Sequence, residues 1–97
     1  MSPEILARLA SLNIQLLSEG AEFCILAREN CVAIVQVRPD AVAVGSSGVM
    51  TESGLAYLVW REGRPLLASH GGVETPAAPE QVEAVQQFSA DLKQALP

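Results

Sequence analysis

His70 and its neighbours are the first candidates for chemistry in this chain. His70 is the only histidine, and histidine is the usual acid–base side chain at neutral pH. Gly71 and Gly72 follow it and could let a ligand approach the main chain. Glu74 is close enough in sequence to orient the imidazole ring. This segment therefore suggests a ligand-binding or catalytic histidine.

A catalytic triad would also need a nucleophile, for which Ser46, Ser47 and Cys24 are the candidates. None of them stands at a spacing from His70 that is typical of a catalytic family. We therefore interpret His70 as a solvated residue of a turn and expect no enzyme. A small enzyme that uses His70 is the least favoured hypothesis.

The segment Gly45-Ser46-Ser47-Gly48 resembles a phosphate-binding loop only in composition. Such loops hold phosphates where a strand leads into a helix, whereas this segment is expected between two strands. It also lacks the Gly-Lys-Ser/Thr ending of a P-loop and the spacing of Gly-x-Gly-x-x-Gly. We interpret residues 45–54 as an irregular connection or a glycine-marked bulge, and we expect no cofactor.

Cys24 and Cys31 are expected to be free, buried thiols. If Glu29-Asn30 form the tip of a hairpin, the two cysteines lie several residue pairs apart. That separation exceeds the roughly 4.4–6.8 Å between Cα atoms that a disulfide tolerates. Two cysteines and one histidine without ligand spacing cannot form a structural zinc site, so we expect no metal.

The charge of the chain disfavours two classes of partner. Six Lys and Arg residues stand against eleven Asp and Glu residues, and the basic residues are scattered along the 97 positions. Nucleic acids and anionic membranes bind to basic patches, so we expect neither as a partner. The segment Met1-Ser2-Pro3-Glu4 is unlike a signal peptide, and the apolar run 31–37 is too short to span a bilayer. We expect a cytoplasmic protein.

The remaining pattern is a series of short strands between two helices. Ser2 as a cap and Pro3 at the first helical position predict a helix over 3–12, and Asn13 suits a left-handed end. A second apolar stripe predicts a helix that begins near Pro79. Between them we expect strands at 14–17, 22–28, 31–37, 41–44, 55–61 and 66–69, with turns at 18–20, 38–40 and 62–65.

Every expected connection between strands is short, which leaves no room for crossover helices. Residues 1–97 should therefore form a single α+β domain. Its antiparallel meander sheet should have five or six strands, flanked by an N-terminal and a C-terminal helix. We expect both helices on one sheet face. The competing arrangement places one helix on each face.

The central strands 22–28 and 31–37 are apolar on both alternating faces. A strand with one wet face should carry polar residues at every second position, so both faces of these strands need cover. We therefore expect a homodimer that forms by a two-fold contact of the uncovered face. The alternatives are a monomer with both faces covered, or an excess of alanine, which any surface tolerates.

Tyr57 and Trp60 lie on opposite faces of strand 55–61, so one should enter the core and the other should anchor an interface. We expect a small cytoplasmic protein-interaction or adaptor module that self-associates through an apolar sheet face and can take a protein partner. The alternative is a small-molecule-binding or sensory domain with a pocket near residues 45–54 and 70–72. The candidate binding residues are Tyr57, Trp60, His70, Gly71 and Gly72.

Overall fold

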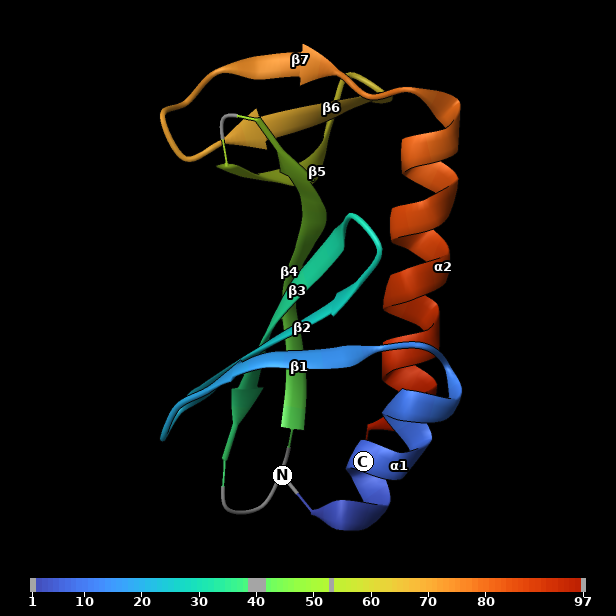
Figure 1. The fold of residues 1–97 in the computed structure, drawn as a ribbon. Helices are drawn as coiled ribbons and strands as arrows, with labels where there is room; N and C mark the ends of the chain where they lie inside the picture. The colour runs from blue at the N-terminus through green and yellow to red at the C-terminus, as the bar shows by residue number, and fades with distance from the viewer. Residues whose placement is uncertain (1, 39–41, 53, 97) are drawn as a thin grey trace.

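Seven antiparallel strands follow one another in chain order and curve around two terminal helices (Figure 1). The structure is a computed structural model and describes residues 2–38, 42–52 and 54–96. Each strand is hydrogen-bonded to the next one along the chain. The elements are α1 (Pro3–Ser11), β1 (Gln15–Glu19), β2 (Phe23–Arg28), β3 (Cys31–Val37), β4 (Val42–Thr51), β5 (Gly54–Arg61), β6 (Arg64–Ser69), β7 (Glu74–Pro76) and α2 (Pro79–Ala95).

The expected α+β meander with a helix at each end is confirmed, but its sheet has seven strands instead of five or six. The additional strand is β7, whose Thr75 pairs with Leu67 of β6. Three residues are too few to show an alternating pattern, so this strand leaves no periodic signal in the sequence. The expected turn at Pro39-Asp40 and the expected strand start at Ala41 lie outside the described residues.

The prediction that residues 45–54 form an irregular connection is wrong. Most of this segment is the second half of the ten-residue strand β4. The extra residue is absorbed by a bulge, because Ser47 pairs with Ala33 while Val44 pairs with Val35. Glycine and serine are poor strand formers, but pairing with β3 and then with β5 overrides this preference.

Both helices pack against the same face of the sheet. One core cluster contains the fully buried side chains of Leu9 from α1, Phe88 and Leu92 from α2, and Leu26 and Val35 from the sheet. The arrangement with one helix on each face is therefore wrong. We name the sheet face away from α1 and α2 the outer face.

Local signals fix the ends of α1 and the tight turns. The Oγ of Ser2 accepts a hydrogen bond from the amide of Ile5 at 3.3 Å, and Asn13 is left-handed with φ 61°, both as expected. Glu62 and Gly63 also have positive φ angles, 52° and 77°, as the two-residue turn of a twisted hairpin requires.

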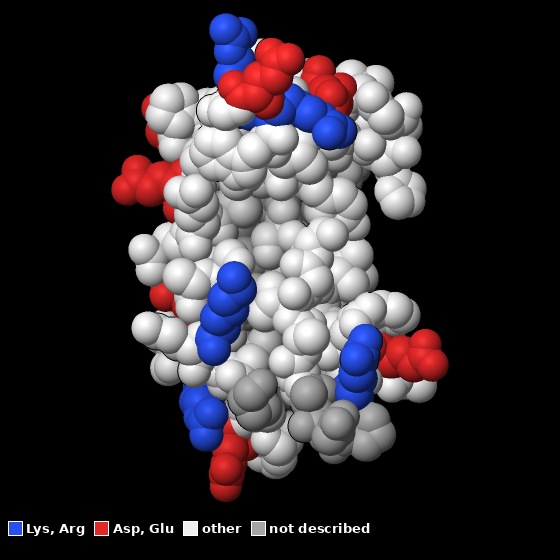
Figure 2. Space-filling view, turned by 180° about the vertical axis from the view of Figure 1, so that it is seen from behind, with Lys and Arg blue, Asp and Glu red and all other residues white. Residues whose placement is uncertain are grey.

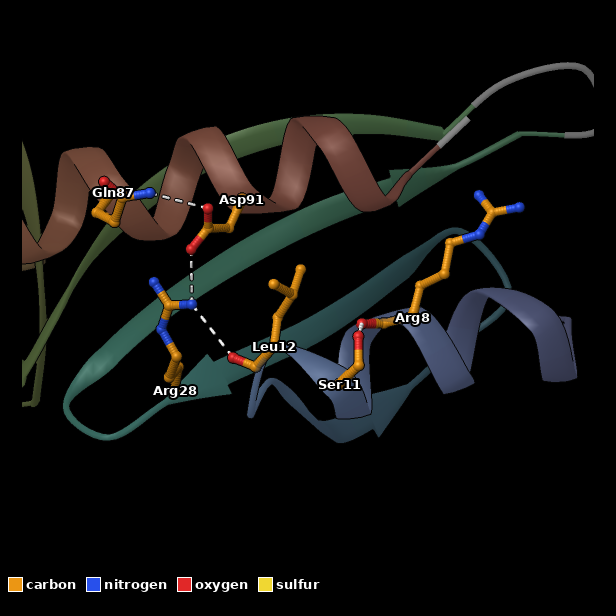
Figure 3. A network of polar contacts seen from close by, with 6 residues as sticks. All are labelled: Arg8, Ser11, Leu12, Arg28, Gln87 and Asp91. Carbon is orange, nitrogen blue, oxygen red and sulfur yellow. Dashed lines mark hydrogen bonds and ion pairs between the residues drawn. The ribbon is translucent and has the colours of Figure 1, made fainter.

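Arg28, at the end of β2, ties the two helices to the sheet (Figure 3). Its Nη1 donates hydrogen bonds to the carbonyl oxygen of Leu12 at 3.2 Å and to Oδ2 of Asp91 at 2.8 Å. The guanidinium carbon lies 5.4 Å from the centre of the Phe88 ring, within cation–π range. Asp91 also accepts a hydrogen bond from Nε2 of Gln87 at 2.9 Å.

Asp91 should make stability depend on acid pH. Hydrogen bonds from Arg28 and then Gln87 hold the pKa of Asp91 below its ordinary value. Because this pKa is lower in the folded state, the ionised carboxylate stabilises the fold at pH values above the unfolded-state pKa of about 3.9. This contribution is lost as the pH falls through the pKa of the folded state. We therefore expect Asp91→Asn to cost stability at pH 7 but little at the most acidic pH.

Urea unfolding at a series of pH values from neutral to acidic measures this difference. Glu83→Gln, an exposed change on the same helix, is the control and should leave the pH dependence as in the parent. If Asp91→Asn lost as much stability as the parent on acidification, the assignment of acid sensitivity to Asp91 would be wrong.

Candidate functional site

The sheet divides between β4 and β5. These strands pair at only four positions next to their connecting turn, from Gly48 opposite Tyr57 to Thr51 opposite Gly54. Beyond this point residues 42–47 of β4 pair only with β3, and residues 58–61 of β5 pair only with β6. Within the described part of the chain, two strand edges therefore face an opening without a neighbouring strand.

The register shows which main-chain groups of β4 point into this opening. The amide of Val37 donates to the carbonyl oxygen of Glu22 at 2.9 Å, so the main-chain N–H and C=O groups of Val37 point toward β2. By alternation, the main-chain groups of Val35 point the same way. In an antiparallel pair of strands, the main-chain groups of two opposite residues either both point toward the partner strand or both point away from it. Val42 and Val44, which lie opposite Val37 and Val35, are therefore directed away from β3 and into the opening.

The second half of β4 follows the same rule. The amide of Met50 donates to the carbonyl oxygen of Asn30 at 2.8 Å, on the β3 side of the strand. The main-chain groups of Gly48 point to the same side as those of Met50, and the main-chain groups of Ser47 point to the opposite side. The main-chain groups of Ser47 therefore also point toward the opening.

Two groups of β5 face them across the opening. Arg61 and Arg64 flank a two-residue turn, and such a closing pair is hydrogen-bonded, so Arg61 is directed toward β6. By alternation, the main-chain groups of Trp60 and Leu58 point away from β6. Pro65, opposite Trp60, has no amide hydrogen to offer, in agreement with this assignment.

A cavity of about 330 Å³ lies between the two edges, and α2 contributes three residues to its wall. We name it the fork cavity. The back of the molecule carries uncharged side chains in its hollowed middle, and charged side chains lie around this hollow and at both ends (Figure 2). No residue that lines the fork cavity is charged: Gly45, Ser46, Ser47, Tyr57, Leu58, Val59, Trp60, Val85, Gln86 and Ser89.

Two residues of β4 shape this cavity. A Cβ atom at Gly45 would lie only 2.8 Å from the carbonyl oxygen of Ile34, so only glycine fits there without a shift of the main chain. The Oγ of Ser47 is buried and has no hydrogen-bond partner among the described residues. An unpaired buried hydroxyl costs about 1–3 kcal/mol, so a hydrogen bond from a bound molecule would be favourable here.

The structure brings together some of the residues that the sequence suggested and separates others. Tyr57 and Trp60 both line the fork cavity and, as expected, come from opposite faces of β5. Trp60 shares the face of the core residue Ala56, yet 52% of it is exposed, so it stands at the margin of the core. The prediction that either Tyr57 or Trp60 enters the core is therefore confirmed only in part, because Trp60 lies on the core face but is half exposed.

His70, Gly71 and Gly72 lie in the exposed turn between β6 and β7. This turn is at the opposite end of β6 from the β5–β6 turn, toward which the fork opens (Figure 1). Glu74 does not orient His70 by any hydrogen bond in the structure and instead accepts one from Nε of Arg61 at 3.1 Å. Another cavity of about 380 Å³ lies beside this turn, between Thr51, Leu67 and Val73.

The two cysteines are free and buried, as expected. Burial raises the pKa of the Cys24 thiol, and the negative charge of Glu19 raises it further. Burial also raises the pKa of the Cys31 thiol. Thiols with raised pKa values form little thiolate at neutral pH, so neither cysteine has the character of a nucleophile.

The wall that α2 contributes to the fork cavity could not be found from the sequence. Val85 belongs to the predicted apolar stripe of the last helix, but Gln86 and Ser89 look like ordinary surface residues. The only local signal was the group of small residues around Gly45, which marks the bulge next to the opening.

Comparison with protein-family models, curated proteins and solved structures finds no match for this chain. Among the described residues, no three His, Cys, Asp or Glu side chains are grouped as metal ligands would be. In the same part of the chain, no helix has the length and apolar character needed to cross a membrane. Function is therefore inferred from the surfaces of this chain alone.

Proposed function

We propose that this protein is a small protein-interaction module that forms a homodimer through the outer face of its sheet. The single observation that carries this proposal is the apolar, uncharged character of that face over β2 to β4. A cytoplasmic location remains a prediction from the sequence.

The register identifies the outer face. Leu26 and Ala33 are paired and belong to the core under the helices. The next pair along these strands, Ala27 and Val32, must point to the other side. Both residues are buried yet lie outside the core cluster. Val32 pairs with Gly48 of β4, so Gly48 lies on the same face. The outer face is therefore the side of β2 and β3 that carries Ala27 and Val32.

The outer positions of β2 to β4 hold no charged residue within the described part of the chain. Phe23 and Met50 are the most exposed large side chains among them, at 48% and 50%. The outer face consists of Phe23, Ile25, Ala27, Val32, Ile34, Gln36, Ala43, Gly48, Met50, Leu55, Tyr57 and Val59.

Polar groups border this face at two ends. Nη2 of Arg38 donates a hydrogen bond to Oε1 of Gln36 at 3.1 Å, and Arg61 forms an ion pair with Glu74 at 3.1 Å. An apolar centre with a polar rim is the usual composition of a protein interface. A two-fold contact places the uncharged centre on its own copy, so it brings no like charges together despite the net charge of −5.

The alternative predicted from the sequence, one small-molecule pocket near residues 45–54 and 70–72, has weaker support. Ser46 and Ser47 line the fork cavity, whereas Thr51 and Glu52 of the same segment line the cavity beside the His70 turn, together with Ser69 and Val73. The two segments thus meet at this second cavity, but the predicted binding residues His70, Gly71 and Gly72 are not among the residues that line it. The position of His70, Gly71 and Gly72 outside this lining favours the interaction module.

Light scattering after size-exclusion chromatography, over a wide range of dilutions, tests the dimer. We expect a dimer at micromolar concentration for the parent and a dissociation constant at least about tenfold higher for Phe23→Asp, because the variant buries an unpaired charge. Val73→Asp is the matched control, since Val73 is 63% exposed and lies away from the outer face. A parent that is monomeric at all concentrations, or an equal effect of both variants, contradicts the proposal.

A further inference from the structure

We propose that the fork cavity binds an extended peptide segment of a partner protein, which adds as a strand to the open edge of β4. The open edge of β4 is the side of residues 42–47 that faces away from β3. This binding site is distinct from the dimer contact proposed above and does not depend on it.

Main-chain hydrogen bonding carries the first step. Val42, Val44 and Ser47 direct main-chain groups into the opening, and no strand among the described residues pairs with these groups. The groups of Val42 and Val44, two residues apart, are about 6.8 Å from each other, twice the rise per residue, and the bulge separates them from Ser47. An extended main chain offers its own donors and acceptors at the same spacing, and strand addition to an open edge is a common mode of peptide recognition.

The composition of the four open edges within the described residues points to the same place. The β5 edge, residues 58–61, is only four residues long and ends with the charged Arg61. The edge formed by β7 is only three residues long and contains Pro76, and the edge formed by β1 carries a bulge near Ser18. Short length, proline and bulges are features that protect an edge from pairing. Residues 42–47 have neither proline nor charge and contain Val42 and Val44, which favour strands. The bulge of β4 lies at residues 45–46, so residues 42–44 have no proline, charge or bulge and are the least protected part of these edges.

The cavity determines which side chains the peptide can carry. In an added strand, every second side chain points toward α2, where Val85, Gln86 and Ser89 form the wall. A charged side chain would lose its water here without gaining a charged partner. Small or apolar uncharged side chains fit these positions, and Trp60 offers them an aromatic contact at the margin.

A second copy cannot occupy the site through a two-fold contact of the same edge. Such a contact places identical surfaces on each other, and here a recess would meet a recess. The occupant must protrude, as a single extended segment does. Ser47 supplies an additional reason for an occupant, since its buried Oγ could hydrogen-bond to a peptide main chain.

Hydrogen exchange of the free protein tests the open edge without any ligand. Ala43 is directed toward β3, opposite Gln36, while its neighbour Val44 is directed into the opening. We expect the amide of Val44 to exchange at least about tenfold faster than that of Ala43. Equal protection of the two amides would show that the edge is paired and would overturn the proposal.

Binding is tested with the blocked peptide Ac-Ser-Val-Thr-Val-Ser-Val-NH2, followed by amide shifts and by the fluorescence of Trp60, the only tryptophan. We expect saturable shifts at Val44 and Ser47 and a blue-shifted emission. The same peptide with N-methyl groups on alternate amides is the control. Methylation on the edge that faces β4 should weaken binding at least about tenfold, because it removes the pairing donors.

Two variants locate the site. Trp60→Ala should weaken peptide binding about tenfold, whereas Val73→Ala, another exposed apolar side chain, should leave it unchanged. Phe23→Asp should also leave it unchanged, which separates this site from the dimer contact. Shifts confined to β1 or β7, absence of any shift at saturating peptide, or equal binding of the methylated peptide would each overturn the proposal.

Discussion

Replacement of Gly48 by alanine is expected to lower the free energy of unfolding by about 3 kcal/mol or more. A Cβ atom at this position would lie 2.0 Å from the carbonyl oxygen of Ala56 and 2.8 Å from the Cα of Tyr57. Both obstacles are main-chain atoms, so no side-chain rotation relieves the overlap. The variant must move β5 away from β4.

The position of Gly48 makes this movement costly. Gly48 pairs with Val32 on one side and Tyr57 on the other, at the last pair before the two strands separate. Displacement there removes pairing from a β4–β5 contact that has only four residue pairs. Small domains are stable by about 5–15 kcal/mol, so a loss of this size removes a large part of the total.

Gly71→Ala is the matched control for this substitution. The nearest atom to its added Cβ would be Oγ of Ser69 at 4.0 Å, an ordinary contact distance. We expect no loss and up to about 1 kcal/mol of gain, since alanine restricts the unfolded chain. Urea unfolding followed by circular dichroism measures both variants, and equal stability of Gly48→Ala and Gly71→Ala would refute the predicted overlap.

Phe88→Ala is expected to cost about 3–5 kcal/mol, the range for removing a buried aromatic side chain. Phe88 is 0% exposed and lies in the core between α2, α1 and the sheet. Its ring also supports the guanidinium of Arg28, which holds Leu12 and Asp91. The substitution therefore leaves a cavity and removes the surface on which this connection rests.

Phe23→Ala provides the comparison with the same chemical change on the outer face. Phe23 is 48% exposed, so we expect a loss below about 1 kcal/mol in dilute solution, where the chain is monomeric. At higher concentration the loss should grow if Phe23 contributes to the proposed dimer, because association stabilises the folded chain. Thermal unfolding at several concentrations measures both effects. A loss for Phe88→Ala no larger than that for Phe23→Ala in dilute solution would mean that the core is assigned wrongly.

The two proposed interaction surfaces depend on different features of one sheet. The outer face uses side chains that the curvature of the sheet leaves uncovered, and Phe23 is its most accessible aromatic residue. The fork cavity uses main-chain groups that the divergence of β4 and β5 leaves unpaired. Tyr57 and Val59 lie on the outer face and also line the cavity, so they are the residues at which binding on one surface could influence the other.

The sequence by itself determined the elements whose signals are local. Ser2 and Asn13 mark the ends of the first helix because capping depends on residues a few positions apart. Strand β3 (Cys31–Val37) has the predicted bounds because an uninterrupted apolar run lies between recognisable turns. The order of these elements and their short connections then left an antiparallel meander as the simplest fold.

Only the tertiary structure decided where the sheet divides and what the division exposes. Whether Ser47 continues a strand depends on partners in β3, and whether Trp60 meets an open edge depends on how far β4 follows β5. The wall supplied by Gln86 comes from a helix far away along the chain. Pairing between strands and packing of a helix on a sheet are set by the whole arrangement, and a weak local preference yields to them.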